Sequence, residues 1–327
     1  MSATRAARLR EASAWAAPLL VLIVIAGAIE MLRPGSFAID QLSLKCAAAL
    51  TLIFVATGET IVVLRGGIDL AVGGIVSLAT AIAATSAAAA AGPDASFAAL
   101  LPWLALILAV GGGIGMLNSV LISLLGLQPF LVTLATWSIV EGIALIVQPS
   151  EGGNVPAAWF SFGYSTVLGL PISVVLILVL IAWWAWFRRT RTASRIRAAG
   201  SNERSAYLNR VSLIRTNVAA YGLSGLFAAL AGWFYATQTG AGSPTVGTQY
   251  ILPAIAAVVI GGTSLLGGRG GLIGTIIGAF ILNLIGDIVF LFKLQSYWQP
   301  VASGLILVLV VVITSLSEAT ANRSGVE

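Results

Sequence analysis

The chain is a series of long apolar runs, each apolar on all sides rather than along one stripe. A helix needs about 20 such residues to cross the hydrocarbon core of a membrane, and helices that face lipid or one another on every side show this pattern. The pattern predicts about ten spans, at residues 15–32, 42–64, 70–91, 97–125, 129–148, 171–187, 217–238, 250–264, 271–292 and 298–316. Clusters of Pro and Gly, such as Pro34-Gly35 and Gly92-Pro93, mark the ends of several runs.

The composition agrees with a membrane protein. Only 9% of the 327 residues are charged and 58% are hydrophobic, and the mean hydropathy is +1.00. A soluble domain has about 25% charged residues, so a soluble enzyme, a disordered chain and a fibrous repeat are excluded. We expect an all-α, polytopic membrane protein with one transmembrane domain over residues 1–327. The chain has no His and one Cys, Cys46, so we expect no metal site, no disulfide and no cofactor.

Positive charge is concentrated on one side of the predicted spans. With a cytoplasmic N-terminus and ten alternating spans, three of the 17 cationic residues, Arg33, Lys45 and Lys293, fall outside. Cytoplasmic loops carry an excess of Lys and Arg, which places both termini in the cytoplasm of a bacterial cell with the chain in its inner membrane. The run 250–264 is short and is either a full span or a broken, re-entrant segment. If it does not cross, every later loop changes sides. The net charge of +5 follows from this bias and implies no nucleic-acid partner.

The sequence contains no element for ATP hydrolysis. A phosphate-binding loop needs the pattern G-x-x-x-x-G-K-[ST], whereas Lys45 and Lys293 each follow an apolar residue. The glycine-rich stretch 261–270 carries Arg269 in place of a lysine. We therefore expect that the chain is not an enzyme and that ATP-driven transport requires a separate ATPase.

The candidates for charged groups inside the membrane are Glu59, Asp69, Glu141 and Asp287. Charged groups inside a membrane are costly and usually face a cavity or a partner. A secondary carrier that couples transport to ions through Glu59, Asp69 or Asp287 is therefore one hypothesis. Asp69 directly precedes the run 70–91 and is better placed to cap that helix. Glu59 and Glu141 stay open between a buried pair, a neutral acid and a position on the transport pathway. The polar candidates for the pathway are Glu59, Asn118, Glu141 and Asn283.

The segment 188–216 is the main polar stretch, with eight Arg and one acid, Glu203. Three interpretations compete: the positive-inside bias alone, binding to anionic lipid head groups, and docking of a cytoplasmic protein. In favour of docking, Gly200 ends one helical run and Ser201 or Asn202 can cap a short helix after it. Glu203 then suits the first turn of that helix. We expect this helix to lie across the cytoplasmic face and to couple the spans to a partner. The candidate coupling residues are Gly200, Asn202, Glu203, Ala206, Tyr207 and Leu208.

Four stretches, in this order, resemble the membrane permease subunits of ATP-binding-cassette (ABC) sugar importers of the ribose, xylose, arabinose and galactose type. They are GGIDLAVG at 66–73, QPFLVTL at 128–134, YGLSG at 221–225 with Ala231-Gly232 after it, and the glycine-rich stretch 261–270. Trp298-Gln299 extends the match, which covers roughly 59–299. The glycine–isoleucine–aspartate signature is specific, and four ordered stretches make coincidence a poor explanation.

The resemblance implies the fold of a type II ABC importer permease and the partners of such a subunit. These are cytoplasmic ABC ATPase subunits, a second permease subunit (the same or a related chain), a periplasmic or extracellular substrate-binding protein, and membrane lipid. It also implies that Gly200, Asn202 and Ala206 belong to the loop that contacts the ATPase. The motif residues for which structural or gating roles are expected are Gly66, Gly67, Asp69, Gly73, Pro129, Phe130, Thr133, Gly261, Gly262 and Gly268. The chain departs from the family pattern at Ala71, Asn209-Arg210 and Glu141.

We expect a permease that moves a monosaccharide or a related small polar solute inward by alternating access, powered by the separate ATPase. The alternatives are the ion-coupled carrier and a permease of the same superfamily for nucleosides or branched-chain amino acids. The outer segment 151–170, rich in aromatic residues, is either a contact for the substrate-binding protein or an interfacial helix that rests on lipid.

Overall fold

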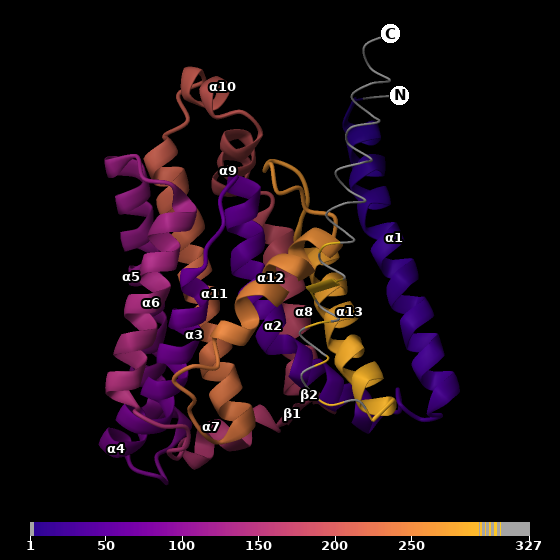
Figure 1. Ribbon diagram of the computed structural model, residues 1–327, viewed down its shortest axis with the longest axis vertical. Helices are drawn as coiled ribbons and strands as arrows, with labels where there is room; N and C mark the ends of the chain where they lie inside the picture. The colour runs from indigo at the N-terminus through magenta and orange to yellow at the C-terminus, as the bar shows by residue number, and fades with distance from the viewer. Residues whose placement is uncertain are drawn as a thin grey trace.

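The computed structural model describes residues 3–293 and positions 295, 298, 301, 304, 305 and 308, with side chains from residue 16 onward. Long helices run along the longest axis of the molecule (Figure 1). Those that coincide with predicted spans are α1 (Ala3–Leu32), α2 (Ile39–Arg65), α3 (Ala71–Ala81), α5 (Phe97–Leu125), α6 (Pro129–Val147), α8 (Ile172–Phe187), α11 (Leu213–Thr239), α12 (Thr248–Ile260) and α13 (Leu272–Leu291). Most of the span predicted at 298–316 lies outside the described residues.

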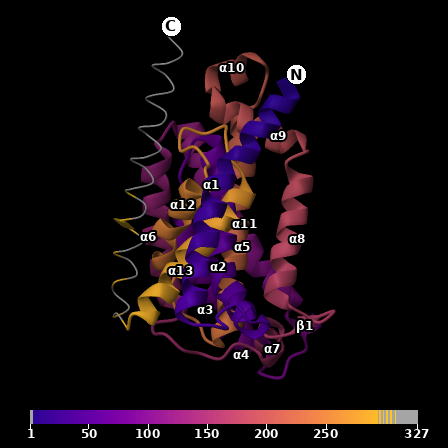
Figure 2. The same ribbon diagram turned by 90° about the vertical axis from the view of Figure 1, so that its right-hand side faces the viewer.

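The remaining elements are short and lie at the two ends of the long helices (Figures 1 and 2). At one end are α9 (Arg191–Ser201) and α10 (Glu203–Leu208). At the other end are α4 (Ala87–Ala91), which continues α3 through the π-helical turn η1 (Ile82–Ser86), then α7 (Ala157–Gly163), and the antiparallel pair β1 (Thr166–Val167) and β2 (Leu170–Pro171).

Six of the described helical segments are long and apolar enough to cross a membrane, and a seventh is added if α8 and α9, bent by 76°, count as one span. The apolar part of α1 and all of α12 are shorter. The all-α membrane fold is therefore confirmed, and the prediction of ten spans is approximate.

Helix α2 forms the centre of the molecule, and α11 packs beside it against α5 and α3. Every residue of α2 from Ala49 to Arg65 is buried. Small residues let the neighbouring helices approach closely: a side chain on Gly115 of α5 would stand 2.0 Å from the carbonyl oxygen of Tyr221 on α11. The same kind of contact joins Gly278 of α13 to Ala257 of α12. Such stripes of small residues drive helix association where water cannot.

The chain between α11 and α12 is irregular over residues 240–247. It starts beside the end of α3 and η1, where Gly242 and Gly152 form an isolated β-bridge. Its other end, Gly247, lies against Gly73 near the start of α3. Helix α12 then continues to Gly261, close to Gly274 at the start of α13. The short run predicted at 250–264 is thus the helical half of a broken segment that extends from one end of the molecule to the other.

Candidate coupling site

In the described part of the chain, Arg65 and the loop of Arg269 lie at the same end of the molecule as the segment 188–216, as the loop count predicts. Arg65 at the end of α2 forms an ion pair with Glu203 at the start of α10. The loop that carries Arg269 lies beside them, because the amide of Gly268 donates to the carbonyl oxygen of Leu64 over 3.0 Å. Toward the opposite end, Lys45 forms an ion pair with Asp287. We call the first end, with α9 and α10, the arginine end; its assignment to the cytoplasm remains a prediction.

Helices α9 and α10 are each started by a side-chain cap. Thr190 accepts from the amide of Ala193, and Asn202 accepts from the amide of Ser205 over 2.8 Å. Such caps satisfy amides that a helix leaves without partners in its first turn. The cap of the short helix at Asn202, and Glu203 in its first turn, agree with the sequence prediction. The sequence predicted that Gly200 ends the preceding helix. This prediction is wrong, because α9 continues to Ser201.

Gly200 has a packing role instead. A side chain at this position would stand 2.0 Å from the carbonyl oxygen of Leu64, in the last turn of α2. Gly267 lies on the carbonyl of Gly200, and Gly268 lies on Ser201. Both have positive φ, +87° and +73°, in the region that favours glycine. Three separate segments therefore meet backbone to backbone at the end of α2.

The ion pair between Arg65 and Glu203 adds a side-chain link to this junction. Arg65 Nη2 and Glu203 Oε1 are 2.9 Å apart, and the side chain of Arg65 is 10% exposed against 61% for Glu203. Such a half-exposed pair contributes little stability, about 0–1 kcal/mol. Its value is geometric, because it fixes α10 to α2.

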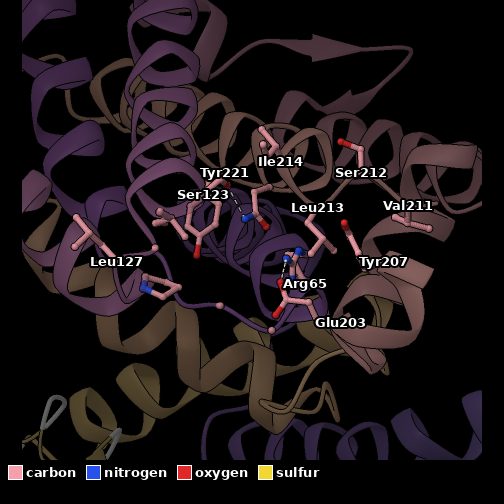
Figure 3. Close-up of a pocket in the computed structure, with 16 residues that line it drawn as sticks. Arg65, Ser123, Leu127, Glu203, Tyr207, Val211, Ser212, Leu213, Ile214 and Tyr221 are labelled. Atoms are coloured by element: carbon pink, nitrogen blue, oxygen red, sulfur yellow. Dashed lines mark hydrogen bonds and ion pairs between the residues drawn. The ribbon is translucent and has the colours of Figure 1, made fainter. Parts of the chain in front are cut away.

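A cavity of about 670 Å³ opens beside this pair, between the end of α2, the end of α5, α10 and the start of α11 (Figure 3). Arg65, Glu203 and Tyr207 line one part, and Tyr221 and Asn217 line another. Asn217 Nδ2 donates to Ser123 Oγ over 2.9 Å. The hydroxyl of Tyr221 is buried and forms no hydrogen bond with the residues that the structure describes. The cavity is therefore polar on the side of α2 and α11, and its walls include the candidate coupling helix.

The glycine–isoleucine–aspartate motif forms the loop between α2 and α3. Gly66 ends α2 in the left-handed conformation, with φ of +88°, as helix C-termini often do. The amide of Asp69 donates to both carboxylate oxygens of Glu59 at 3.3 Å, and Asp69 Oδ1 accepts from the amide of Ala71 at 3.1 Å. Asp69 thus bonds to the start of α3, the position proposed from the sequence. Thr133 of α6 donates to the carbonyl of Ile68.

The other motif residues occupy close contacts between elements. Gly67 lies under the hydroxyl of Tyr221, and Gly73 lies under Ile251 of α12. Gly261 faces Gly274 across the α12–α13 contact. Pro129 is the first residue of α6 and lines the cavity, whereas Phe130 is exposed. Gly262 follows α12 with φ of +80°. Gly66 and Gly67 are thus brought to the arginine end with the coupling helix, while Asp69 and Gly73 lie deeper.

The structure does not bring the four polar pathway candidates together. Glu59 and Asn118 are fully buried; Asn118 accepts from Thr136 over 2.6 Å. Glu141 is half-buried on α6 and accepts from Thr248 over 2.8 Å. Asn283 is half-buried on α13.

The sequence reasoning missed two sets of interactions. One is the Lys45–Asp287 pair, which joins residues 242 positions apart. The other is the hydrogen bonding of the irregular segment: Thr80 Oγ1 donates to the carbonyl of Ser243, and Ser77 Oγ accepts from the amide of Gly247. Isolated Ser and Thr in apolar runs gave no signal, since the segment they bind is far away in sequence.

The aromatic segment at the opposite end is partly internal. Trp159 of α7 is fully buried against Trp233, and Phe162 packs between Phe97 and Trp233. Phe160 and Tyr164 are exposed. The surface left for a lipid or protein contact is therefore smaller than the sequence suggested.

The chain matches the family model described as branched-chain amino acid transport system / permease component over residues 44–313. It is 32% identical to the ribose import permease protein RbsC of Escherichia coli K12, over 90% of this chain and 92% of that protein. It is 35% identical to a probable ABC transporter permease protein, y4mJ, of Sinorhizobium fredii, over 94% of this chain and 90% of that protein. The D-allose transport system permease protein AlsC of E. coli K12 is 32% identical, over 81% and 80%.

No solved structure matches the chain. The family match covers most of the chain, and the relatives are matched over most of their length. Members of this family are transport subunits whose ATPase lies in a separate subunit. The chain therefore belongs to the permease component family, as a multi-pass membrane subunit of an ABC importer and not as an enzyme.

Proposed function

We propose that the chain translocates a monosaccharide or a related small polar solute inward by alternating access, driven by ATP hydrolysis in the separate ATPase subunit. The relatives named for ribose and D-allose support the substrate class. The main observation in support of this mechanism is the packing of α9 onto the end of α2, to which the Arg65–Glu203 ion pair also links α10. In a chain without an ATPase site, the partner must drive the conformational change. This junction would transmit that change to α2.

The proposed docking element is α10. Tyr207 and Leu208 are 69% and 73% exposed, while Ala206, one residue before them, is buried and holds the helix to the molecule. Large exposed side chains on a fixed short helix suit insertion into a groove of the ATPase, because a protein partner gains most from desolvating such anchors. Gly200, Asn202 and Glu203 position this helix rather than bind the partner themselves.

The other proposed partners follow from the two ends of the molecule. A substrate-binding protein would approach the end that carries α7 and the β1–β2 hairpin, where Phe160 and Tyr164 are exposed. A second permease subunit, the same or a related chain, would complete the pathway, and lipid would cover the remaining apolar faces. In this arrangement the N-terminus and the arginine end face the cytoplasm.

A combined binding and uptake experiment tests the proposal. The chain is co-expressed with its ATPase and reconstituted into proteoliposomes, and uptake of D-ribose and D-allose is measured with and without ATP and the binding protein. The Tyr207→Ala/Leu208→Ala variant should lose the ATPase on co-purification while keeping its melting temperature. The Leu168→Ala variant, at a 99% exposed position of the opposite end, is the matched control and should keep it.

Two outcomes would contradict the proposal. Uptake by the chain alone that is abolished by a proton or sodium ionophore would support the ion-coupled carrier instead. The Lys45–Asp287 pair argues against that hypothesis at Asp287, since this acid already has a cation. Binding of nucleosides or branched-chain amino acids, and not of sugars, by the partner binding protein would replace the substrate class and leave the coupling mechanism in place.

A further inference from the structure

One face of the molecule carries exposed polar residues at the depth of the membrane. On the irregular segment and the first turn of α12, Thr245, Thr248 and Gln249 are exposed. The hydroxyl of Thr248 donates to Glu141 of the neighbouring α6 over 2.8 Å. Helices α6 and α12 both lie on the side of the molecule toward the viewer in Figure 1, and α8 lies on the opposite side (Figure 2). We call these four residues the polar face.

The helix lengths give the depth of the polar face. Pro129 begins α6 at the cavity of the arginine end, and Glu141 lies twelve residues further along. Ile260 ends α12 at the same end, and Thr248 lies twelve residues before it. At a rise of about 1.5 Å per residue, both residues lie about 18 Å along their helices from that end. The hydrocarbon core is about 30 Å thick, so this distance falls well inside it.

Lipid is a poor neighbour for these groups. A carboxylate facing hydrocarbon is costly, and irregular backbone at membrane depth is tolerated only where it is buried in protein or lines a water-filled cavity. The inner side of the segment is already satisfied, since Ser243 and Gly247 bond to Thr80 and Ser77 of α3. The outer side carries the exposed hydroxyls of Thr245 and Thr248 and the side-chain amide of Gln249. Something polar must therefore cover it.

We propose that the polar face lines the aqueous translocation pathway and that Glu141, Thr248 and Gln249 hydrogen-bond the hydroxyls of the passing sugar, with the second permease subunit of the proposed function as the opposite wall. This inference rests on the proposed function and assigns its solute contacts. A carboxylate accepts hydrogen bonds from sugar hydroxyls, while Thr and Gln both donate and accept. A closed two-fold pair brings the same face of each copy to the axis, so the two polar faces meet across one path.

The position of the single cysteine allows a direct accessibility test. Cys46 is buried, and Cys46→Ala gives a background without thiols. Thr245→Cys and Gln249→Cys are then compared with Leu178→Cys and Val179→Cys, which are 53% and 57% exposed on α8. Proteoliposomes of the whole transporter are treated with a membrane-impermeant methanethiosulfonate reagent. We expect labelling at 245 and 249, protection by saturating D-ribose or D-allose, and no labelling at 178 or 179.

Each result decides one part of the inference. Labelling at 245 and 249 no faster than at 178 and 179 would overturn the aqueous lining. Labelling that neither sugar slows would overturn the solute contact. A bifunctional thiol reagent should link two copies at 245 and not at 178; its failure at both 245 and 249 would remove the second copy as the opposite wall.

Variants at Glu141 give an independent readout. Glu141→Gln keeps the size of the side chain and its bond to Thr248 but removes the charge, and Glu141→Leu removes both. A hydrogen bond to a charged group is strong enough that its loss should raise the KM of sugar uptake about tenfold. The melting temperature and ATPase binding should not change.

Wild-type uptake with unchanged KM in both variants would contradict the inference and leave the proposed function intact. Absence of ATP-dependent uptake in the wild type would contradict the proposed function itself.

Discussion

Lys45 of α2 and Asp287 of α13 form an ion pair across 242 residues of sequence. The ammonium group of Lys45 also lies 5.3 Å from the ring centre of Phe37, within the range of a cation–π contact. The pair ties α13 to the central helix at the end away from the arginines, where sequence alone suggested two isolated charges.

Removing one member of this pair should destabilise the protein more than removing both. Lys45→Met leaves a carboxylate in apolar surroundings, and such half-pairs are costly because the remaining charge loses its partner. We expect the Lys45→Met/Asp287→Leu double variant to melt closer to the wild type in detergent than either single variant. If the decrease in melting temperature of the double variant equals the sum of the decreases in the two single variants, the two residues do not interact.

Gly200→Ala should disrupt the junction of α9 with α2. The new methyl group would meet the Leu64 carbonyl at 2.0 Å, so one of the two helices must shift. We expect lower melting temperature and weaker ATPase co-purification. Gly113→Ala on α5 is the matched control because nothing lies within 4 Å of the added carbon. There, alanine should be neutral or stabilise by up to about 1 kcal/mol through helix propensity.

The Arg65–Glu203 pair should affect coupling more than stability. Glu203 is mostly exposed, so Glu203→Gln should cost less than about 1 kcal/mol of folding free energy. We expect it to lower sugar-dependent stimulation of the ATPase, because α10 loses its link to α2. Arg65→Glu/Glu203→Arg should restore part of that stimulation. Arg204→Gln, at the next and likewise exposed position, provides the comparison; an equal effect there would point to a general role of charge.

Close packing of α5 on α11 predicts that glycine positions differ strongly in their tolerance of alanine. Gly115→Ala would place a methyl group 2.0 Å from the backbone of Tyr221, whereas Gly142→Ala on α6 meets nothing within 4 Å. Overpacking of this kind costs about 1–3 kcal/mol. Thermal unfolding in detergent measures both variants. Equal melting temperatures of the two variants would contradict the prediction, because they would show that α5 and α11 can move apart without loss of stability.

Most of the long helices and the capped short helix at 203–208 could be predicted from the sequence. Uniformly apolar runs of membrane length predicted helices that the structure contains, and Asn202 followed by Glu203 predicted a capped short helix because capping depends on neighbouring residues. The charge bias correctly grouped Arg65 with the loop 188–216. These are local properties, or sums over loops, and they need no knowledge of packing.

The rest depended on contacts that no local pattern encodes. Gly200 looked like a helix end because glycine often is one, but in α9 its missing side chain serves the approach of α2. Glu59 had no partner in the sequence because its partner is a backbone amide, that of Asp69. Glu141 departs from the family pattern, but only its bond to Thr248 and the break before α12 indicate a role for it. Tertiary neighbours decided each of these cases.

The last turn of α2 touches α9 and the 261–268 loop with almost no side chain between the backbones, and the Arg65–Glu203 ion pair joins α10 to the same turn. Such backbone contacts cannot absorb a small displacement, because there is no side chain between the two segments that could change its rotamer. A displacement of α9 and α10 that keeps these contacts intact must therefore move α2 as a rigid body. Through the bond from Asp69 to Glu59, the same displacement reaches the first turn of α3, the helix that holds the broken segment in place.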